Sequence, residues 1–385
     1  MLQRPVLHAS IEKALQRSPV VALLGPRQCG KTTMARAIAA SRPAAFFDME
    51  SHADRSRLSN PQLALEGLGG LIVIDEIQHQ PDLLQTLRVL ADRPDQPARF
   101  LILGSASPDI VRHSSETLAG RIEFIDMGGF DMFETGPEAL DALWSRGTFP
   151  RSFLAATEED SFAWRQNFIR TFLERDIPQL GITIPAETLR RFWIMLAHYH
   201  GQTWNASEIS RSFGVSDKTV RHYLDLLSGT FMVRQLPPWF ENTKKRQIKS
   251  PKVYLRDSGL AHALLGLRNH DELMAHPKSG ASWEGFALEQ VIRAAPDAEI
   301  FFWATHAGAE LDLLLLRGGK KFGVECKLGD APRLTRSMRT ALENLHLQHL
   351  WVIYPGRHRY PLDPKVTALP LRELRTELLF SPPSQ

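Results

Sequence analysis

The chain has 385 residues, enough for two or three domains, and its 43% hydrophobic and 23% charged residues are ordinary for a globular protein. No apolar run is long enough to predict a membrane span, and the first ten residues lack the apolar core of a secretory signal. The net charge of +3 permits contact with nucleic acid without requiring it. Both cysteines fall inside candidate sites, so we expect a cytoplasmic protein without a structural disulfide.

A phosphate-binding loop is the clearest motif. The apolar run at residues 20–24 predicts a buried strand, which leads into G-x-x-x-x-G-K-T and then into a helix-like segment. In such a loop the backbone N–H groups surround a phosphate at the positive end of the following helix. The motif predicts an ATP site made of Gly25, Pro26, Arg27, Gln28, Cys29, Gly30, Lys31, Thr32 and Thr33.

Four side chains have specific predicted roles in ATP hydrolysis. Lys31 would reach the β- and γ-phosphates, and the Thr32 hydroxyl would ligate Mg²⁺. Residues 71–74 are all aliphatic, which is typical of a strand buried on both faces of a parallel sheet. Asp75 and Glu76 follow at its carboxyl end, where Asp75 would join the Mg²⁺ shell and Glu76 would polarise the attacking water.

A further aliphatic run, residues 99–107, ends in small hydroxylated residues. Ser105 is the candidate for contacting the γ-phosphate or the lytic water, and an ordinary turn at a strand end is the alternative.

This order of parts resembles the AAA-type ATPases. The resemblance narrows to prokaryotic proteins that join an AAA domain to a winged helix and a C-terminal domain of unknown function, on the phrases at residues 75–78, 118–121, 236–239 and 250–254. It implies a homo-oligomer in which an arginine of a neighbouring subunit completes the ATP site. Arg121 is the candidate for that role, and a plain surface arginine is the alternative.

The middle of the chain predicts packed helices followed by a helix-turn-helix. Aromatic residues at helical spacing mark residues 158–200 as core. In residues 205–224, Ser207 and Ser216 would cap two helices, and Lys218, Thr219, Arg221 and His222 would lie on the recognition face. Strands near 231–233 and 253–255 would form the wing. Residues 205–256 hold ten Lys or Arg against four Asp or Glu, densest at Lys244, Lys245 and Arg246. We expect DNA contact, with protein docking or an oligomer scaffold as alternatives.

The C-terminal part carries an acid on a helix, an acid opening a strand, and E-x-K on the next strand. These residues are Glu284, Asp312, Glu325 and Lys327, and their order resembles the restriction-endonuclease-like fold. Asp312 and Glu325 would hold Mg²⁺, and Lys327 would orient water or offset phosphate charge. Glu289 is a second choice for the role of Glu284. A domain that binds DNA but has lost cleavage is the alternative.

We therefore expect an α/β protein in three parts: an AAA-type ATPase domain at residues 1–150, a helical lid with a winged helix at 151–260, and a restriction-endonuclease-like domain at 261–385. ATP, Mg²⁺ and DNA are the expected ligands. The leading hypothesis is an ATPase that acts on DNA. The alternatives are an ATP-gated DNA-binding regulator and a signalling ATPase with a silent C-terminal domain.

Overall fold

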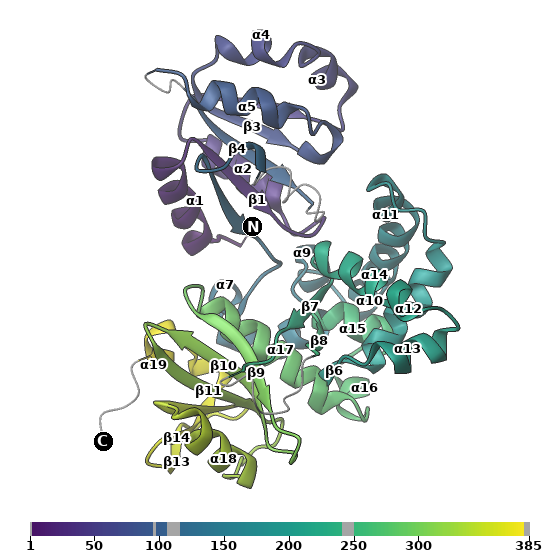
Figure 1. The fold of residues 1–385 in the computed structure, drawn as a ribbon, viewed down its shortest axis with the longest axis vertical. Coiled ribbons are helices and arrows are strands. Elements are labelled where there is room, and N and C mark those ends of the chain that lie inside the picture. Colours follow the sequence, from purple (N-terminus) through teal and green to yellow (C-terminus); the bar gives the residue numbers. More distant parts are fainter. Residues whose placement is uncertain (1, 95–97, 106–115, 241–249, 381–385) are drawn as a thin grey trace. The chain divides into compact units, whose positions relative to one another are not determined.

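The computed structural model describes residues 2–94, 98–105, 116–240 and 250–380 (Figure 1). The chain forms two compact units, one of Met1–Phe130 with Asp225–Met232 and the other of Asp131–Leu224 with Val233–Gln385. The predicted α/β class is confirmed, with a parallel sheet, a helical middle and a mixed C-terminal sheet. In the described ranges, no helix combines the length and the apolar character needed to cross a membrane.

The first unit is built on a five-stranded parallel sheet. Its order is β2-β3-β4-β1-β5, with bounds β1 Val20–Leu24, β2 Ala44–Asp48, β3 Gly70–Asp75, β4 Ala98–Gly104 and β5 Ile122–Asp126. Since β4 lies between β1 and β3, the residue after β4 emerges between the phosphate loop and the acid pair. All three ends therefore meet at one edge of the sheet.

Helices cover both faces of this sheet, which explains its unbroken apolar strands. One core joins Val21 and Leu23 to α1 (Pro5–Arg17) and α2 (Lys31–Ala39). A second core joins the alternate β1 residues to side chains of α4 (Pro61–Glu66) and α5 (Leu83–Ala91) and to Leu58, which follows α3 (His52–Arg57). The prediction that β3 is buried on both faces is confirmed, because its alternate residues enter the two cores.

The helical part of the second unit holds a row of packed aromatic rings. Phe149, Phe168, Phe172 and Trp193 lie with successive ring centroids 4.7, 6.2 and 5.2 Å apart. The predicted place of Phe168, Phe172 and Trp193 in the core is confirmed. The helices are α7 Met132–Thr135, α8 Leu140–Arg146, α9 Pro150–Phe153, α10 Glu158–Thr171, α11 Ile177–Gln179, α12 Ala186–His198, α15 Ser258–Leu264 and α16 His270–Met274, with a π-helical turn at Phe172–Asp176.

Two helices and a small sheet follow where the helix-turn-helix is predicted. The helices are α13 (Ala206–Phe213) and α14 (Asp217–Gly229), and Gly214 joins them at φ +73°, a conformation that favours glycine. The sheet has the antiparallel order β6-β8-β7, with bounds β6 Gln202–Thr203, β7 Val233–Leu236 and β8 Lys252–Leu255.

One predicted helix cap is wrong and the other is confirmed. Asn205, not Ser207, caps α13, since its side chain accepts the N–H of Glu208. Ser207 lies two residues further along, inside the first turn, and donates to Asp217 instead. Ser216 accepts the N–H of Thr219 as a helix cap should.

The C-terminal sheet has six strands in the order β13-β14-β12-β11-β10-β9. Its elements are α17 Ser279–Ala294, β9 Glu299–Ala304, β10 Glu310–Arg317, β11 Lys320–Cys326, α18 Arg336–Leu345, β12 His349–Tyr354, β13 Tyr360–Asp363, β14 Val366–Pro370 and α19 Thr376–Phe380. β10 and β11 form a hairpin, and α17 and α18 both contact this pair of strands. The hairpin thus carries Asp312 and Glu325 on neighbouring strands.

Candidate functional site

The phosphate loop has the backbone that its glycines permit. A Cβ on Gly25 would lie 2.0 Å from the carbonyl oxygen of Met127, so only glycine fits at the start of the loop. Gly30 has φ +102° and stands just before α2. The loop therefore delivers Lys31 to the first position of α2, at the positive end of the helix.

Lys31 and Thr32 both make hydrogen bonds within the candidate ATP site. The ammonium of Lys31 is buried and donates to the carbonyl oxygens of Gly25 and Pro26, both at 2.9 Å. The Thr32 hydroxyl donates to Asp75 Oδ2 at 2.6 Å, so the two predicted Mg²⁺ ligands are in contact. Burial raises the pKa of Asp75, while the Thr32 hydrogen bond opposes that rise. This hydroxyl and carboxylate form an oxygen donor set that fits Mg²⁺.

Glu76 belongs to a short polar chain that also includes Ser105. Gln78 donates through Nε2 to the Glu76 carboxylate and, at 2.9 Å, to Ser105 Oγ. Glu76 has φ +52°, a strained value for a residue with a side chain, and Arg27 lies 4.0 Å from its carboxylate. In the sequence, Gln78 stands out only as part of the family phrase at residues 75–78. Its spacing of two residues after Glu76, in a segment predicted to follow the strand, was the available signal.

Arg121 lies at the amino ends of the parallel strands, whereas the phosphate loop lies at their carboxyl ends. Its carbonyl accepts the N–H of Val20, the first residue of β1, whereas the phosphate loop follows the last residue of that strand. The guanidinium makes two hydrogen bonds to Asp92, at 2.6 and 2.8 Å. Arg121 therefore does not reach the ATP site of its own chain, and its role toward a neighbouring chain stays a prediction.

The predicted recognition face of α14 is largely exposed. Lys218, Arg221 and His222 are exposed and Thr219 is partly buried, whereas Val220 faces the core. Lys244, Lys245 and Arg246 lie outside the described residues. The four α14 side chains thus form one polar helical face, and DNA contact there stays a prediction.

The four predicted C-terminal residues come together. Asp312 accepts the N–H of Cys326 at 2.8 Å across the hairpin, and Lys327 Nζ lies 2.7 Å from Glu325 Oε1. Glu284 reaches the same place from α17. Burial, together with the charge of Asp312, raises the pKa of Glu284 to about 7 and that of Glu325 to about 8. Burial is the larger cause of both shifts, and the lysines that contact these carboxyl groups oppose it.

Three further residues belong to this cluster. Lys252 Nζ lies 3.3 Å from Glu284 Oε1 and 3.7 Å from Asp312 Oδ1, and it also pairs with Glu310. Tyr254 donates to Glu284 Oε1 at 2.6 Å. Alternation along a strand places Lys252 and Tyr254 on one face of β8, but the sequence does not say which acids that face meets.

Glu289, the second choice for the helix acid, does not join the cluster. It pairs with Arg234, at 2.9 Å for one of the two contacts, and lies 3.8 Å from Arg256. Although burial alone would raise it, these guanidinium groups lower the pKa of Glu289 to about 2. Glu289 lies five positions after Glu284, so the two side chains project from different sides of α17.

Two carboxylates of the cluster fit a magnesium ion. Glu325 Oε2 is buried and has no hydrogen-bond partner among the described residues, and Asp312 is also buried. Mg²⁺ is commonly held by one or two carboxylates and water. Asp312 and Glu325 would be the protein ligands, with water completing the shell. No group of three or more His, Cys, Asp or Glu side chains in the described ranges is arranged to hold a metal ion.

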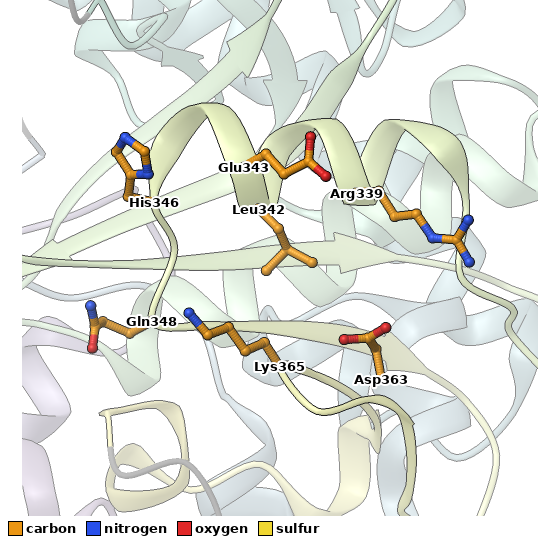
Figure 2. Close-up of a pocket in the computed structure, with 7 residues that line it drawn as sticks. All are labelled: Arg339, Leu342, Glu343, His346, Gln348, Asp363 and Lys365. Carbon is orange, nitrogen blue, oxygen red and sulfur yellow. The ribbon is translucent and has the colours of Figure 1, made fainter.

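A surface pocket lies apart from the residues predicted above. It is about 550 Å³ in volume and lies beside α18 and the segments of Gln348 and Lys365 (Figure 2). Figure 2 shows side chains of both charges around it, among them Arg339, Glu343 and Asp363. All three side chains are exposed. A specific ligand-binding site usually holds buried polar groups, so these exposed charges do not mark the pocket as one.

Three families match the chain in turn. An AAA domain matches residues 17–136, and two families described as domains of unknown function, DUF8612 and DUF4143, match residues 137–271 and 279–374. Among solved structures, a Walker-type ATPase of Pyrococcus abyssi is 15% identical, with TM-score 0.49, over 69% of this chain and 96% of that one. AMPPCP-bound DnaA of Aquifex aeolicus is 12% identical, with TM-score 0.30, over 58% and 86%. At these values neither likeness extends to function.

Two curated relatives are much more similar. The uncharacterised proteins Mb2031c of Mycobacterium bovis and Rv2008c of Mycobacterium tuberculosis are each 51% identical over 376 residues, which is 98% of this chain and 85% of theirs. The chain belongs to the family of these uncharacterised mycobacterial proteins, and its first domain is an ATPase domain of the AAA type.

Proposed function

We propose that this protein hydrolyses ATP and uses the turnover to act on DNA. The observation that carries the proposal is the meeting of Thr32, Asp75 and the Glu76–Gln78–Ser105 chain at one edge of the sheet. A protein that only binds ATP needs the loop and the Mg²⁺ ligands. A carboxylate held next to them, able to polarise water, favours hydrolysis.

Each residue of the ATP site has one task in this proposal. Bound Mg²⁺, held by Thr32 and Asp75, would supply the positive charge that neutralises the phosphates. Lys31 would exchange its two carbonyl partners for phosphate oxygens. Glu76 would accept hydrogen bonds from the attacking water, with its carboxylate oriented by Gln78.

Action on DNA is supported by the exposed face of α14. Lys218 and Arg221 are both exposed there, and phosphate contacts by such side chains supply most of the affinity of a basic DNA-binding module. The local excess of basic residues in this part of the chain supports the same partner.

The C-terminal domain would contribute a nuclease-like site. Asp312 and Glu325 would hold Mg²⁺, which polarises a phosphodiester and activates water when bound. Lys327, which lies next to Glu325, would offset the charge that develops on the phosphate. A second candidate, an ATP-gated DNA-binding protein with a silent C-terminal site, is favoured by the Lys252 ammonium that lies among the acids.

One set of assays on a single preparation tests these candidates. ATP turnover and Mg²⁺-dependent nicking are measured with single-stranded, duplex and branched DNA. We expect turnover to rise several-fold with DNA. Glu76→Gln should bind ATP without turnover, and Lys31→Ala should lose binding, with exposed Lys13→Ala as the unaffected control. Turnover indifferent to every DNA would favour a signalling ATPase, and normal turnover in Glu76→Gln would remove that residue from catalysis.

A further inference from the structure

Lys252 brings a buried positive charge to the C-terminal acids. Its side chain comes from β8 of the small antiparallel sheet, not from the six-stranded sheet that carries Asp312 and Glu325. Lys252 is only 3% exposed. Such a burial is tolerated only where the charge is paired, and here Glu284, Glu310 and Asp312 surround the ammonium.

β8 makes a second contact with the same acids. Tyr254 lies two residues after Lys252, hence on the same face of the strand, and donates to Glu284 at 2.6 Å. Glu284 therefore receives both an ammonium and a hydroxyl from β8. Its Oε1 is not open to a metal ion in this arrangement.

One carboxylate oxygen of the cluster has no hydrogen-bond donor among the described residues. Glu325 Oε2 is buried without a hydrogen-bond partner in the described part of the chain, and its other oxygen accepts from Lys327. A buried carboxylate oxygen of this kind attracts a cation. A divalent ion there would also require Asp312, whose Oδ1 lies 3.7 Å from the Lys252 ammonium.

We propose that Lys252 is the resident cation of the C-terminal site, and that a divalent metal ion binds Asp312 and Glu325 only when this ammonium leaves. The Lys252 side chain is only 4% exposed, so its charge would repel a metal ion strongly at this distance. The Lys327 side chain is 40% exposed, so water screens its charge more and it can stay beside the metal. β8 then keeps the metal ion out of the site for as long as Lys252 stays in place. The inference rests on the metal-site part of the proposed function, and it requires neither ATP hydrolysis nor DNA cleavage.

The test is a Mn²⁺ titration of the nucleotide-free full chain, followed by calorimetry or by electron paramagnetic resonance of free Mn²⁺. The proteins compared are wild type, Lys252→Met, Lys252→Gln, Asp312→Asn and Lys252→Met/Asp312→Asn. Both Lys252 variants should bind one Mn²⁺ per chain at least about tenfold more tightly than wild type, because one opposing charge is gone. The gain should vanish in the double variant, which separates this site from Thr32 and Asp75.

Two results would overturn the inference. One is an unchanged or weaker Mn²⁺ affinity in folded Lys252→Met or Lys252→Gln. The other is an equal gain in Lys252→Met and in Lys252→Met/Asp312→Asn, which would place the tighter Mn²⁺ site away from Asp312. A Lys252→Met protein that binds Mn²⁺ tightly but never nicks DNA would refute cleavage, and it would still support the exclusion of metal by Lys252.

Discussion

At the scale of single residues, the side chain of Gln78 links the two halves of the ATP site. Its amide nitrogen contacts both Glu76 and Ser105, which come from the ends of β3 and β4. A carboxylate that polarises water needs a fixed direction as well as a charge. In the proposed mechanism Gln78 would be a positioning residue, since it would act on the attacking water only through Glu76.

Removing this amide should slow hydrolysis without weakening ATP binding. We expect Gln78→Ala to lower kcat by roughly tenfold to a hundredfold at unchanged Kd for ATP, because only the orientation of Glu76 is lost. Gln80→Ala is the matched control, since Gln80 bonds the carbonyl of Leu58 and not Glu76. Equal rates for the two variants, measured by phosphate release, would contradict the positioning role.

A buried histidine couples the stability of the second unit to pH. His262 donates through Nδ1 to the carbonyl of Ser145 and accepts from Ser282, which in turn accepts from Trp144. Burial lowers the pKa of His262 to about 3, against an ordinary value of 6.5. The unfolded chain therefore takes up this proton first as the pH falls.

The free energy of unfolding should fall as the pH is lowered from 6.5, and the loss due to His262 should continue toward pH 3. Between pH 6.5 and 5 the contribution of His262 is about 2 kcal/mol, at about 1.4 kcal/mol per pH unit. Urea unfolding of His262→Gln should show a shallower loss over this range, although the variant is less stable at pH 7. Parallel pH profiles for the two proteins would show that His262 is not the group that titrates.

At the scale of elements, α17 is held against the buried ring of His200. A Cβ on Gly285 would lie 2.1 Å from His200 Nε2, and the other ring nitrogen is fixed because Nδ1 accepts the N–H of Leu255 at 3.0 Å. Gly285 is therefore a packing requirement of this helix.

The same helix offers its own control. Gly285→Ala should destabilise the protein by roughly 1–3 kcal/mol through overpacking. Gly280→Ala, where nothing lies within 4 Å of the new Cβ, should stabilise it by up to about 1 kcal/mol because alanine favours the helix. Thermal unfolding of both variants decides the matter, and a stabilised Gly285→Ala would contradict the close approach.

The sequence predicted elements well where local pattern and burial agree. The aliphatic run before Asp75 and Glu76 forms a buried strand, because parallel sheets covered on both faces select such runs. The prediction for Ser207 is wrong because Asn205, two residues earlier, can cap the helix with the same kind of side-chain oxygen. Lys252 was missed for another reason. Its partners are 32 to 60 positions away, and only the packing of β8 brings them together.

At the scale of the whole molecule, the position of Arg121 bears on oligomerisation. Its carbonyl pairs with Val20, and the phosphate loop begins after Leu24, so roughly 15 Å of strand separates Arg121 from Gly25. That span is too long for its side chain, which is already directed to Asp92. If Arg121 acts in catalysis, it acts on the ATP site of another chain.

A mixing experiment tests this directly. Arg121→Ala and Lys31→Ala should each lack ATP turnover when tested alone. Arg121→Ala would lose a charge that raises kcat by about 10³-fold or more, and Lys31→Ala would lose ATP binding. Mixed assemblies should regain turnover, because an intact loop from one chain meets Arg121 of the other. Asp92→Ala is the control for the ion pair and should keep turnover, since it leaves the guanidinium free to reach a neighbour. Normal turnover in Arg121→Ala, or no recovery in mixtures that do assemble, would make Arg121 a surface residue whose partner is Asp92.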